Sequence, residues 1–489
     1  MNFSKLTIED ISKKLQNKEV SSLELCKFFL KQIKKIDPQI NACISVFEKE
    51  ALAEAKDADK RIASGEKGLL LGIPYLVKDN ILTKGKKTTA ASKMLENYIA
   101  PYNATIITRL RNAGAVLLGK TNMDEFAHGA STENSAFFTT KNPWDLDRVP
   151  GGSSGGSAAA VSAGLCVFAL GSDTGGSIRQ PSSFCGVNGL KPSYSRVSRY
   201  GLISMTSSTD VIGPITKNAE DLAIVLNCIS GFDENDLSSS KEVVVDYLKE
   251  SKKDLGKIKI AIVPEFINSL EDKYRNAILN AIDIFRKNGA EIKEVSFEYN
   301  KYAVPAYYII TPSEISSNLA RLDGIRYGFS CDYKAKGCSV ENLAEIYSNN
   351  RGMSFGSEAK RRIMLGTYAL SAGYFDAYYK KAMAVKDLII KEFDEIFSDC
   401  DIILTPTSPK TAFKIGEKVN DPVQMYLEDI FVTAPSFAGL PAASIPVGLV
   451  DNLPFGMQII ANKFREDLVL RAARLFQEKT DFNKNLPNL

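Results

Sequence analysis

Amphipathic segments and short apolar runs alternate along the chain, and this alternation predicts an α/β protein. Residues 7–63 are predicted to be helical, and Thr7 and Ser21 precede the helical runs as N-cap residues do. The second of these runs is predicted to end before Asp37–Pro38, because proline lacks the backbone N–H that a helix interior needs. Further helices are predicted over residues 104–112, 272–288 and 358–397, the last with a break near Gly373.

Short apolar runs between these segments predict strands, because buried strands are typically four to eight residues long. The runs span residues 69–78, 116–118, 167–170, 258–263, 402–406 and 443–447. Strands are predicted on both sides of the charged, Ser-rich segment 233–257, so we interpret that segment as a surface excursion within one domain. Residues 1–489 are therefore predicted to form a single large domain.

The composition is that of a soluble globular protein, with 44% hydrophobic and 24% charged residues. A net charge of +3 over 489 residues gives no sign of the concentrated basic face that nucleic-acid-binding proteins carry. No apolar run reaches the length of a membrane span, and the first residues lack the apolar region of a signal peptide. We therefore expect a cytoplasmic protein without a membrane segment.

The cysteine and histidine residues argue against a structural metal site. The eight cysteines are scattered and form no Cys-x-x-Cys pair, and Cys331 and Cys338 are too far apart for a zinc knuckle. The chain has one histidine, His128. We expect reduced, mostly buried thiols and no metal ligands.

Two Gly/Ser-rich loops, residues 151–157 and 171–177, flank one short apolar stretch and carry the most specific chemistry in the sequence. They bring hydroxyl groups, those of Ser153 and Ser177 among them, and many unhindered backbone N–H groups close together. Acyl transfer needs these parts, a nucleophile and an oxyanion hole. A serine before a helix can also be an ordinary N-cap, so neither serine identifies the chemistry alone.

A serine nucleophile needs a base, and the sequence offers two. His128 is the only residue that could complete a Ser-His-Asp arrangement, but no acidic partner is evident beside it. The alternative is a lysine that burial keeps neutral. Lys78 fits this requirement, because it ends the apolar run of residues 73–77.

Residues 114–121 match the phosphate-loop pattern G-x-x-x-x-G-K-[ST]. In a phosphate loop the four middle residues form an exposed loop whose amides bind phosphate. Here they are Ala-Val-Leu-Leu, which favour a buried strand, and a predicted helix precedes them where a strand should stand. We therefore do not expect a nucleotide to bind at Lys120.

Several segments together resemble the amidase signature family. They are Gly151–Ser157, Gly171–Arg179, Gly186–Pro192 and Asp210–Pro214, within a core of about residues 70–215, and the similarity runs over nearly the whole chain. The resemblance implies a single α/β domain, a large mixed sheet surrounded by helices. It also implies a Ser-cisSer-Lys triad in which Ser177 attacks the substrate amide and Ser153 passes the proton to neutral Lys78.

The same resemblance implies roles for the residues around Ser177. The backbone amides of Thr174, Gly175, Gly176 and Ser177 would form the oxyanion hole. Asp173 and Arg179 would form an ion pair that fixes this loop.

Other segments resemble, within the family, the glutaminase (A) subunits of the tRNA-dependent amidotransferases that act on Glu-tRNA(Gln) or Asp-tRNA(Asn). They are Met123–Phe126, Arg196–Gly201, Arg361–Gly366, Asp376–Lys381 and Pro406–Pro409. The implied substrate is glutamine, and the residues implied to bind it are Ser131, Tyr308, Arg362 and Asp429. A guanidinium suits its α-carboxylate and a carboxylate suits its α-ammonium group.

The resemblance also implies partners. B and C subunits would complete a heterotrimer, in which the B subunit binds tRNA, ATP and Mg²⁺, and this chain itself would need no cofactor. The alternative is a free-standing amidase that hydrolyses another small amide. Three residues depart from the pattern, His128, Ala130 and Ser195, and they affect substrate contacts rather than the triad.

Overall fold

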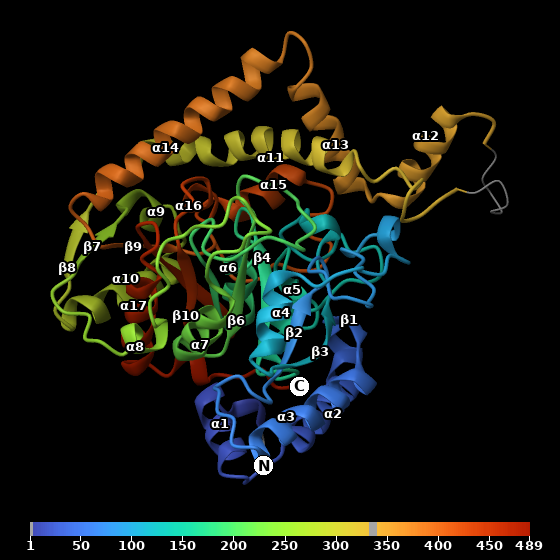
Figure 1. Cartoon of the computed structure of the whole chain (residues 1–489). Coiled ribbons are helices and arrows are strands. Elements are labelled where there is room, and N and C mark those ends of the chain that lie inside the picture. The colour runs from blue at the N-terminus through green and yellow to red at the C-terminus, as the bar shows by residue number, and fades with distance from the viewer. Residues whose placement is uncertain (1–2, 332–339) are drawn as a thin grey trace.

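An 11-stranded mixed sheet lies at the centre of the computed structural model, which describes residues 3–331 and 340–489 (Figure 1). The strand order is β1-β3-β2-β4-β6-β5-β10-β11-β9-β7-β8. The strands are β1 (Cys43–Val46), β2 (Pro74–Lys78), β3 (Val116–Thr121), β4 (Phe168–Asp173), β5 (Asn188–Lys191), β6 (Val211–Thr216), β7 (Lys259–Ile262), β8 (Glu291–Glu294), β9 (Ile402–Pro406), β10 (Ala442–Val450) and β11 (Leu453–Ala461).

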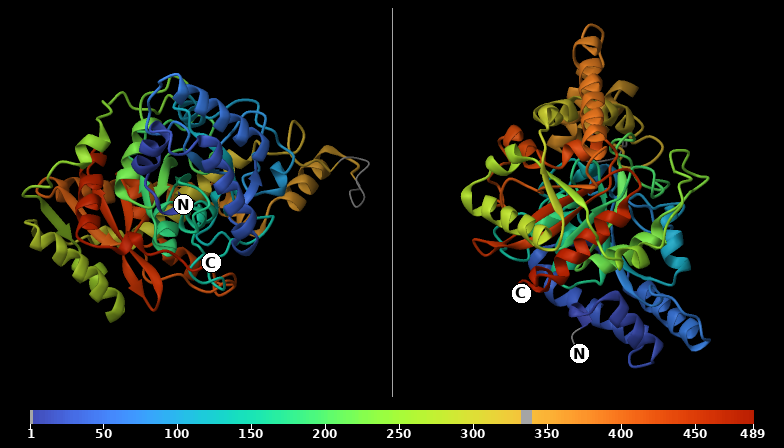
Figure 2. Two further views of the ribbon diagram at one scale, coloured as in Figure 1. Left: turned by 90° about the horizontal axis from the view of Figure 1, so that it is seen from below. Right: turned by 90° about the vertical axis from the view of Figure 1, so that its left-hand side faces the viewer.

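Helices surround this sheet (Figures 1 and 2). They are α1 (Ile8–Gln16), α2 (Ser22–Ile40), α3 (Glu48–Ala63), α4 (Thr105–Asn112), α5 (Gly155–Ser162), α6 (Arg179–Cys185), α7 (Ala219–Ile229), α8 (Tyr247–Ser251), α9 (Pro264–Asn268), α10 (Asp272–Lys287), α11 (Ala303–Leu319), α12 (Leu343–Ser354), α13 (Ser357–Ala369), α14 (Lys381–Phe397), α15 (Pro422–Tyr426), α16 (Thr433–Phe437) and α17 (Glu466–Glu478). The predicted α/β class and mixed sheet are confirmed.

Three neighbouring strands form the part of the sheet that positions the site. β2 runs parallel to both β3 and β4 and lies between them. Every residue of these three strands is buried, because helices cover both faces of the sheet. That double coverage explains why the sequence shows continuous apolar runs here instead of alternation.

Helices α11, α13 and α14 lie on one side of the sheet, opposite α1–α3 and the C-terminal end of the chain (Figure 1). α11 packs against both α13 and α14. α13 and α14 are separate helices joined around Gly373, which has φ +86°, so the break expected there is confirmed.

The N-terminal prediction needs two corrections. Residues 43–46 form β1, which pairs antiparallel with β3, rather than continuing a helix. α2 also runs through Pro38 to Ile40 and ends at Asn41, which adopts φ 54°. A left-handed Asn is a common helix end, and it decided the boundary here instead of proline.

The segment 233–257 is only partly a surface excursion. It contains α8, which packs on α7 and α17, and Tyr247 at its start is buried. Leu237 and Val243 are exposed.

No helix in the described residues is long and apolar enough to cross a membrane.

The cysteine prediction holds in part. Cys26, Cys43, Cys166, Cys185, Cys228 and Cys400 are free. Cys331 is disulfide-bonded, so the expectation of reduced thiols was wrong for this residue. Wide spacing in the sequence excludes a zinc knuckle, but it does not exclude a disulfide. Cys338 lies outside the described residues.

Candidate active site

Lys78 is the last residue of β2, and its side chain is completely buried between the two Gly/Ser loops. Its Nζ donates to the hydroxyl oxygens of Ser153 at 2.8 Å, Ser154 at 2.8 Å and Ser172 at 2.9 Å. Burial lowers the pKa of Lys78 to about 7, although more distant carboxylates partly oppose the shift. A lysine with hydroxyl partners and no contacting carboxylate can serve as a neutral base near neutral pH.

The first loop is tied to the second through its backbone. The Gly152–Ser153 peptide bond is cis. The Ser154 N–H donates to the Ser177 carbonyl at 3.1 Å, and the Gly152 N–H donates to Gln180 Oε1 at 2.9 Å. A Cβ on Gly152 would clash with a carboxylate oxygen of Asp124, so only glycine fits there. The loop that carries Ser153 is thereby fixed against the loop that carries Ser177.

Ser177 lies just before α6, in the loop that follows β4, and its exposed fraction is 8%. Asp173 and Arg179 pair on either side of it, with Nε–Oδ2 at 3.0 Å and Nη2–Oδ1 at 2.9 Å. Burial alone would raise the pKa of Asp173, but the Arg179 charge and hydrogen bonds hold it below its usual value. The expected ion pair is therefore present and spans the Ser177 loop.

Part of the predicted oxyanion hole is already occupied. The Gly176 N–H donates to Asp173 Oδ1 at 2.9 Å, so it is not free for a developing oxyanion. The Thr174, Gly175 and Ser177 amides have no acceptor among the described residues. The Thr174 hydroxyl donates to Asp210 at 2.6 Å, which anchors the loop. The amides of Thr174, Gly175 and Ser177 are the better candidates to stabilise an oxyanion.

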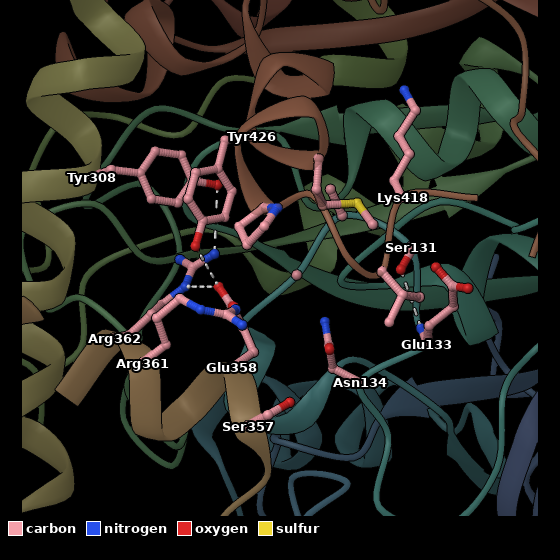
Figure 3. Close-up of a pocket in the computed structure, with 15 residues that line it drawn as sticks. Ser131, Glu133, Asn134, Tyr308, Ser357, Glu358, Arg361, Arg362, Lys418 and Tyr426 are labelled. Carbon is pink, nitrogen blue, oxygen red and sulfur yellow. Dashed lines mark hydrogen bonds and ion pairs between the residues drawn. The ribbon is translucent and has the colours of Figure 1, made fainter. Parts of the chain in front are cut away.

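Three of the four residues predicted to bind the substrate line one cavity of about 60 Å³ (Figure 3). They are Ser131, Tyr308 and Arg362. Arg362 is buried, and its Nε donates to Glu358 Oε1 at 2.7 Å. Its guanidinium lies 4.9 Å from the centre of the Tyr308 ring, a cation–π contact that stabilises the buried charge.

The fourth residue, Asp429, does not line this cavity but lies beside the nucleophile loop. A Cβ on Gly176, which has φ +139°, would lie 3.1 Å from Asp429 Oδ1. Burial, with the nearby Glu428 charge, raises the pKa of Asp429 well above its usual value. Asp429 therefore lies beside the loop that carries Ser177, and a bound cation would stabilise its charged form.

Comparison with known proteins gives a consistent result. The Amidase family model matches residues 24–470. The chain is 53% identical over 484 residues to the A subunit of the glutamyl-tRNA(Gln) amidotransferase of Thermoanaerobacter pseudethanolicus, covering 99% of this chain and 98% of that one. This chain belongs to the amidase family.

Solved structures of other amidases share its fold. The A subunit of the glutamyl-tRNA(Gln) amidotransferase of Thermotoga maritima has 44% identity and a TM-score of 0.81, with 100% of this chain and 98% of that chain covered. A peptide amidase from Stenotrophomonas maltophilia has 27% identity and a TM-score of 0.80, with 99% and 98% covered.

In this amidase, His128 is not placed to act as the base. Burial first, and then the Arg362 charge, lower the pKa of His128 well below its usual value. Neither ring nitrogen has a hydrogen-bond partner among the described residues. The alternative of a Ser-His-Asp arrangement is therefore not supported by the geometry.

The phosphate-loop pattern also lies where nucleotide cannot reach. Residues 116–121 form the buried strand β3, and Lys120 Nζ donates to the Ile81 carbonyl and to Thr88 Oγ1. Burial lowers the pKa of Lys120 to about 8.

In the described part of the chain, no group of three or more His, Cys, Asp or Glu side chains could hold a metal ion.

Four residues of this amidase site were not predicted from the sequence. Ser154 and Ser172 hold Lys78, and Glu358 and Tyr426 hold Arg362. The serine pair at 153–154 was a usable signal for Ser154. Nothing local in the sequence indicates that Tyr426 meets Glu358.

Proposed function

We propose that this chain is the glutaminase subunit of a tRNA-dependent amidotransferase. It would hydrolyse glutamine to glutamate and supply ammonia for the conversion of Glu-tRNA(Gln) to Gln-tRNA(Gln). The observation that carries the proposal is the buried Lys78, hydrogen-bonded to Ser153, in a chain whose relatives are named as the A subunit of glutamyl-tRNA(Gln) amidotransferase.

The proposed reaction begins at Ser177. Its Oγ attacks the side-chain amide carbon of glutamine while its proton passes to Ser153, whose own proton passes to Lys78 Nζ. The free amides among Thr174, Gly175 and Ser177 stabilise the tetrahedral oxyanion. When the intermediate collapses, ammonia leaves with a proton returned through Ser153 from Lys78, and a γ-glutamyl ester remains on Ser177.

Hydrolysis of the ester completes the cycle. Water attacks the ester carbonyl, its proton passes through Ser153 to Lys78, and the Ser177 oxygen is reprotonated as glutamate departs. The same base serves both halves because a lysine with a pKa of about 7 can both take and return a proton near neutral pH.

Recognition of glutamine would use the charged residues around the cavity. Arg362 would bind the α-carboxylate and Asp429 the α-ammonium group, with Tyr308 and Ser131 contacting the same substrate. A free-standing amidase for uncharged amides is the alternative. It has no use for a buried guanidinium at the pocket, so Arg362 favours the amino-acid amide.

The proposed assembly contains B and C subunits. The B subunit would bind tRNA, ATP and Mg²⁺, and the use of tRNA would place the assembly in the cytoplasm. The relatives' designation as one subunit of an enzyme supports this proposal. Large apolar side chains exposed along α13 and beyond, Met364, Tyr368 and Tyr378 among them, are typical of chains that assemble with others.

Amidation of Glu-tRNA(Gln) by the assembled subunits tests the proposal. With glutamine as the nitrogen donor, the wild-type assembly should form Gln-tRNA(Gln) and the Ser177→Ala assembly should not. With ammonium chloride as the donor, both assemblies should form Gln-tRNA(Gln), because Ser177→Ala removes only the glutaminase step. Equal product from glutamine in both assemblies would contradict the proposal.

A further inference from the structure

Two helical segments meet at the cavity, and a single carboxylate oxygen joins them (Figure 3). Glu358 Oε1 accepts from Arg362 Nε at 2.7 Å and from the Tyr426 hydroxyl at 3.1 Å. Glu358 and Arg362 belong to α13, and Tyr426 ends α15. The bond from Tyr426 therefore connects two elements that are far apart in the sequence.

This connection lies one helical turn from each charged group proposed to bind glutamine. Glu358 and Arg362 are four residues apart on α13 and share a face. Tyr426 continues directly into the 3₁₀ turn Leu427–Asp429, so Asp429 follows it by three residues. The position of Arg362 relative to Asp429 is thus set through the Glu358–Tyr426 bond.

Aromatic packing holds the same geometry. The Tyr426 and Tyr308 rings stack with centroids 3.6 Å apart and an interplanar angle of 17°. The Arg362 guanidinium lies 4.9 Å from the Tyr308 ring centre and 5.6 Å from that of Tyr426. Its Nε is bonded to Glu358, whereas its Nη1 has no acceptor within the described residues. The guanidinium is therefore fixed but keeps free donors for a carboxylate.

The net charge of Glu358, Arg361 and Arg362 also suits one substrate carboxylate. Glu358 forms ion pairs with both Arg361 and Arg362, so two guanidinium groups share one carboxylate. One positive charge is left over, and the α-carboxylate of one amino acid would balance it. Without Glu358, two neighbouring cations would repel each other, and one of them is buried.

We propose that Glu358 and Tyr426 are positioning residues that set the spacing between Arg362 and Asp429 and thereby fit the site to an α-amino acid. The inference rests on the proposed glutaminase function. Neither residue needs to contact the reacting amide. Their effect should fall on substrate binding and not on the chemical step.

The test uses steady-state glutaminase kinetics of the assembled enzyme. Tyr426→Phe keeps the ring stack and removes one hydrogen bond, and Glu358→Gln keeps the shape and removes the charge. Each should raise the KM for glutamine about tenfold while kcat stays within about twofold. The inhibition constant of L-glutamate should rise by the same factor. The two effects should be less than additive in the double variant, because Tyr426 bonds to the same carboxylate that Glu358→Gln neutralises, so part of that bond is already lost.

Tyr247→Phe is the matched control. Its hydroxyl donates to the buried Glu466 at 3.3 Å, away from the cavity, so it removes the same kind of bond without moving Arg362. It should leave the KM unchanged. Unchanged KM values in Tyr426→Phe and Glu358→Gln, or additive effects in the double variant, would overturn this inference alone. A wild-type assembly without glutamine turnover would overturn the proposed function and this inference with it.

Discussion

The region around Lys78 and the region around Arg362 are both buried, but the buried side chain has different partners in each. Lys78 is surrounded by the hydroxyls of Ser153, Ser154 and Ser172. Arg362 is paired with the Glu358 carboxylate. Hydroxyls stabilise an ammonium ion less than a carboxylate does, so burial lowers the pKa of Lys78 to about 7. Burial therefore yields a base at Lys78, whereas the Arg362 guanidinium stays protonated and keeps a fixed charge that Glu358 balances.

Lys120 completes this comparison. It is as buried as Lys78 and lies on the neighbouring strand, but it has Asp79 at 3.9 Å. Its pKa is lowered to about 8, with burial as the cause and Asp79 opposing the shift. Burial lowers the pKa of both lysines, and what distinguishes them is their contacts: Lys78 bonds to the Ser153 hydroxyl, whereas Lys120 bonds to the Ile81 carbonyl and Thr88, away from both serine loops.

The largest effect is expected for Ser177→Ala. Glutaminase kcat/KM should fall by at least roughly 10⁴-fold, because no nucleophile remains to form the acyl-enzyme. Ser183→Ala is the matched control, since Ser183 lies buried on the next helix and its hydroxyl has no partner among the described residues. Its kcat/KM should stay near wild type. Glutamate release by Ser177→Ala at a rate near wild type would contradict the assigned nucleophile.

A fall in kcat/KM nearly as large is expected when Lys78 is protonated. The base must be neutral to accept a proton, so kcat/KM should rise with pH through about 7 and level off above it. Below that value it should fall roughly tenfold per pH unit. Lys78→Arg should be inactive across the range, because arginine stays protonated. A flat wild-type profile between about pH 6 and 8 would show that Lys78 does not titrate as the base.

A smaller effect, on binding, is expected at the other end of the pocket. Arg362→Ala should raise the KM for glutamine by roughly 10- to 100-fold with a lesser change in kcat, because a charge-assisted hydrogen bond is lost. Arg286→Ala is the control, since Arg286 forms an exposed ion pair on α10. If kcat alone fell in Arg362→Ala, the residue would belong to the chemical step instead.

The smallest effect on activity is expected for Lys120→Met. The kcat/KM of this variant should level off at the same pH as that of the wild type, and its value should stay within about threefold of the wild-type value. Chemical denaturation should show a loss of about 3–5 kcal/mol, because the buried Asp79 carboxyl loses its partner. The chain should not bind ATP with or without the substitution. ATP binding that disappears with Lys120 would reinstate the phosphate-loop interpretation.

The sequence predicted the arrangement around Lys78 better than that around Arg362, and the reason is physical. Ser153 and Ser177 lie in loops whose glycines are required by close backbone contacts, so their pattern is visible in the chain. Lys78 follows a run that is apolar because helices cover both faces of β2. Ser153 and Ser177 are also only 24 positions apart, although Lys78 lies 75 positions from Ser153.

The region around Arg362 is assembled from distant helices. Glu358 and Tyr426 are 68 residues apart, and no periodicity links them. Asp429 was grouped with Arg362 by similarity, but the structure places it beside Gly176. The Gly176 amide likewise donates to Asp173, a local contact that the prediction of the oxyanion hole overlooked. The course of α2 through Pro38 shows the same limit, because Asn41 determined the helix end.

Identification of the covalent intermediate tests the role of Ser177 most directly. The assembled enzyme is mixed with glutamine, quenched in acid within the first turnover, digested and examined by mass spectrometry. We expect a γ-glutamyl ester on the peptide that contains Ser177, absent from Ser177→Ala and present in Ser183→Ala. A γ-glutamyl group on any other residue, or glutamine turnover by Ser177→Ala, would contradict it.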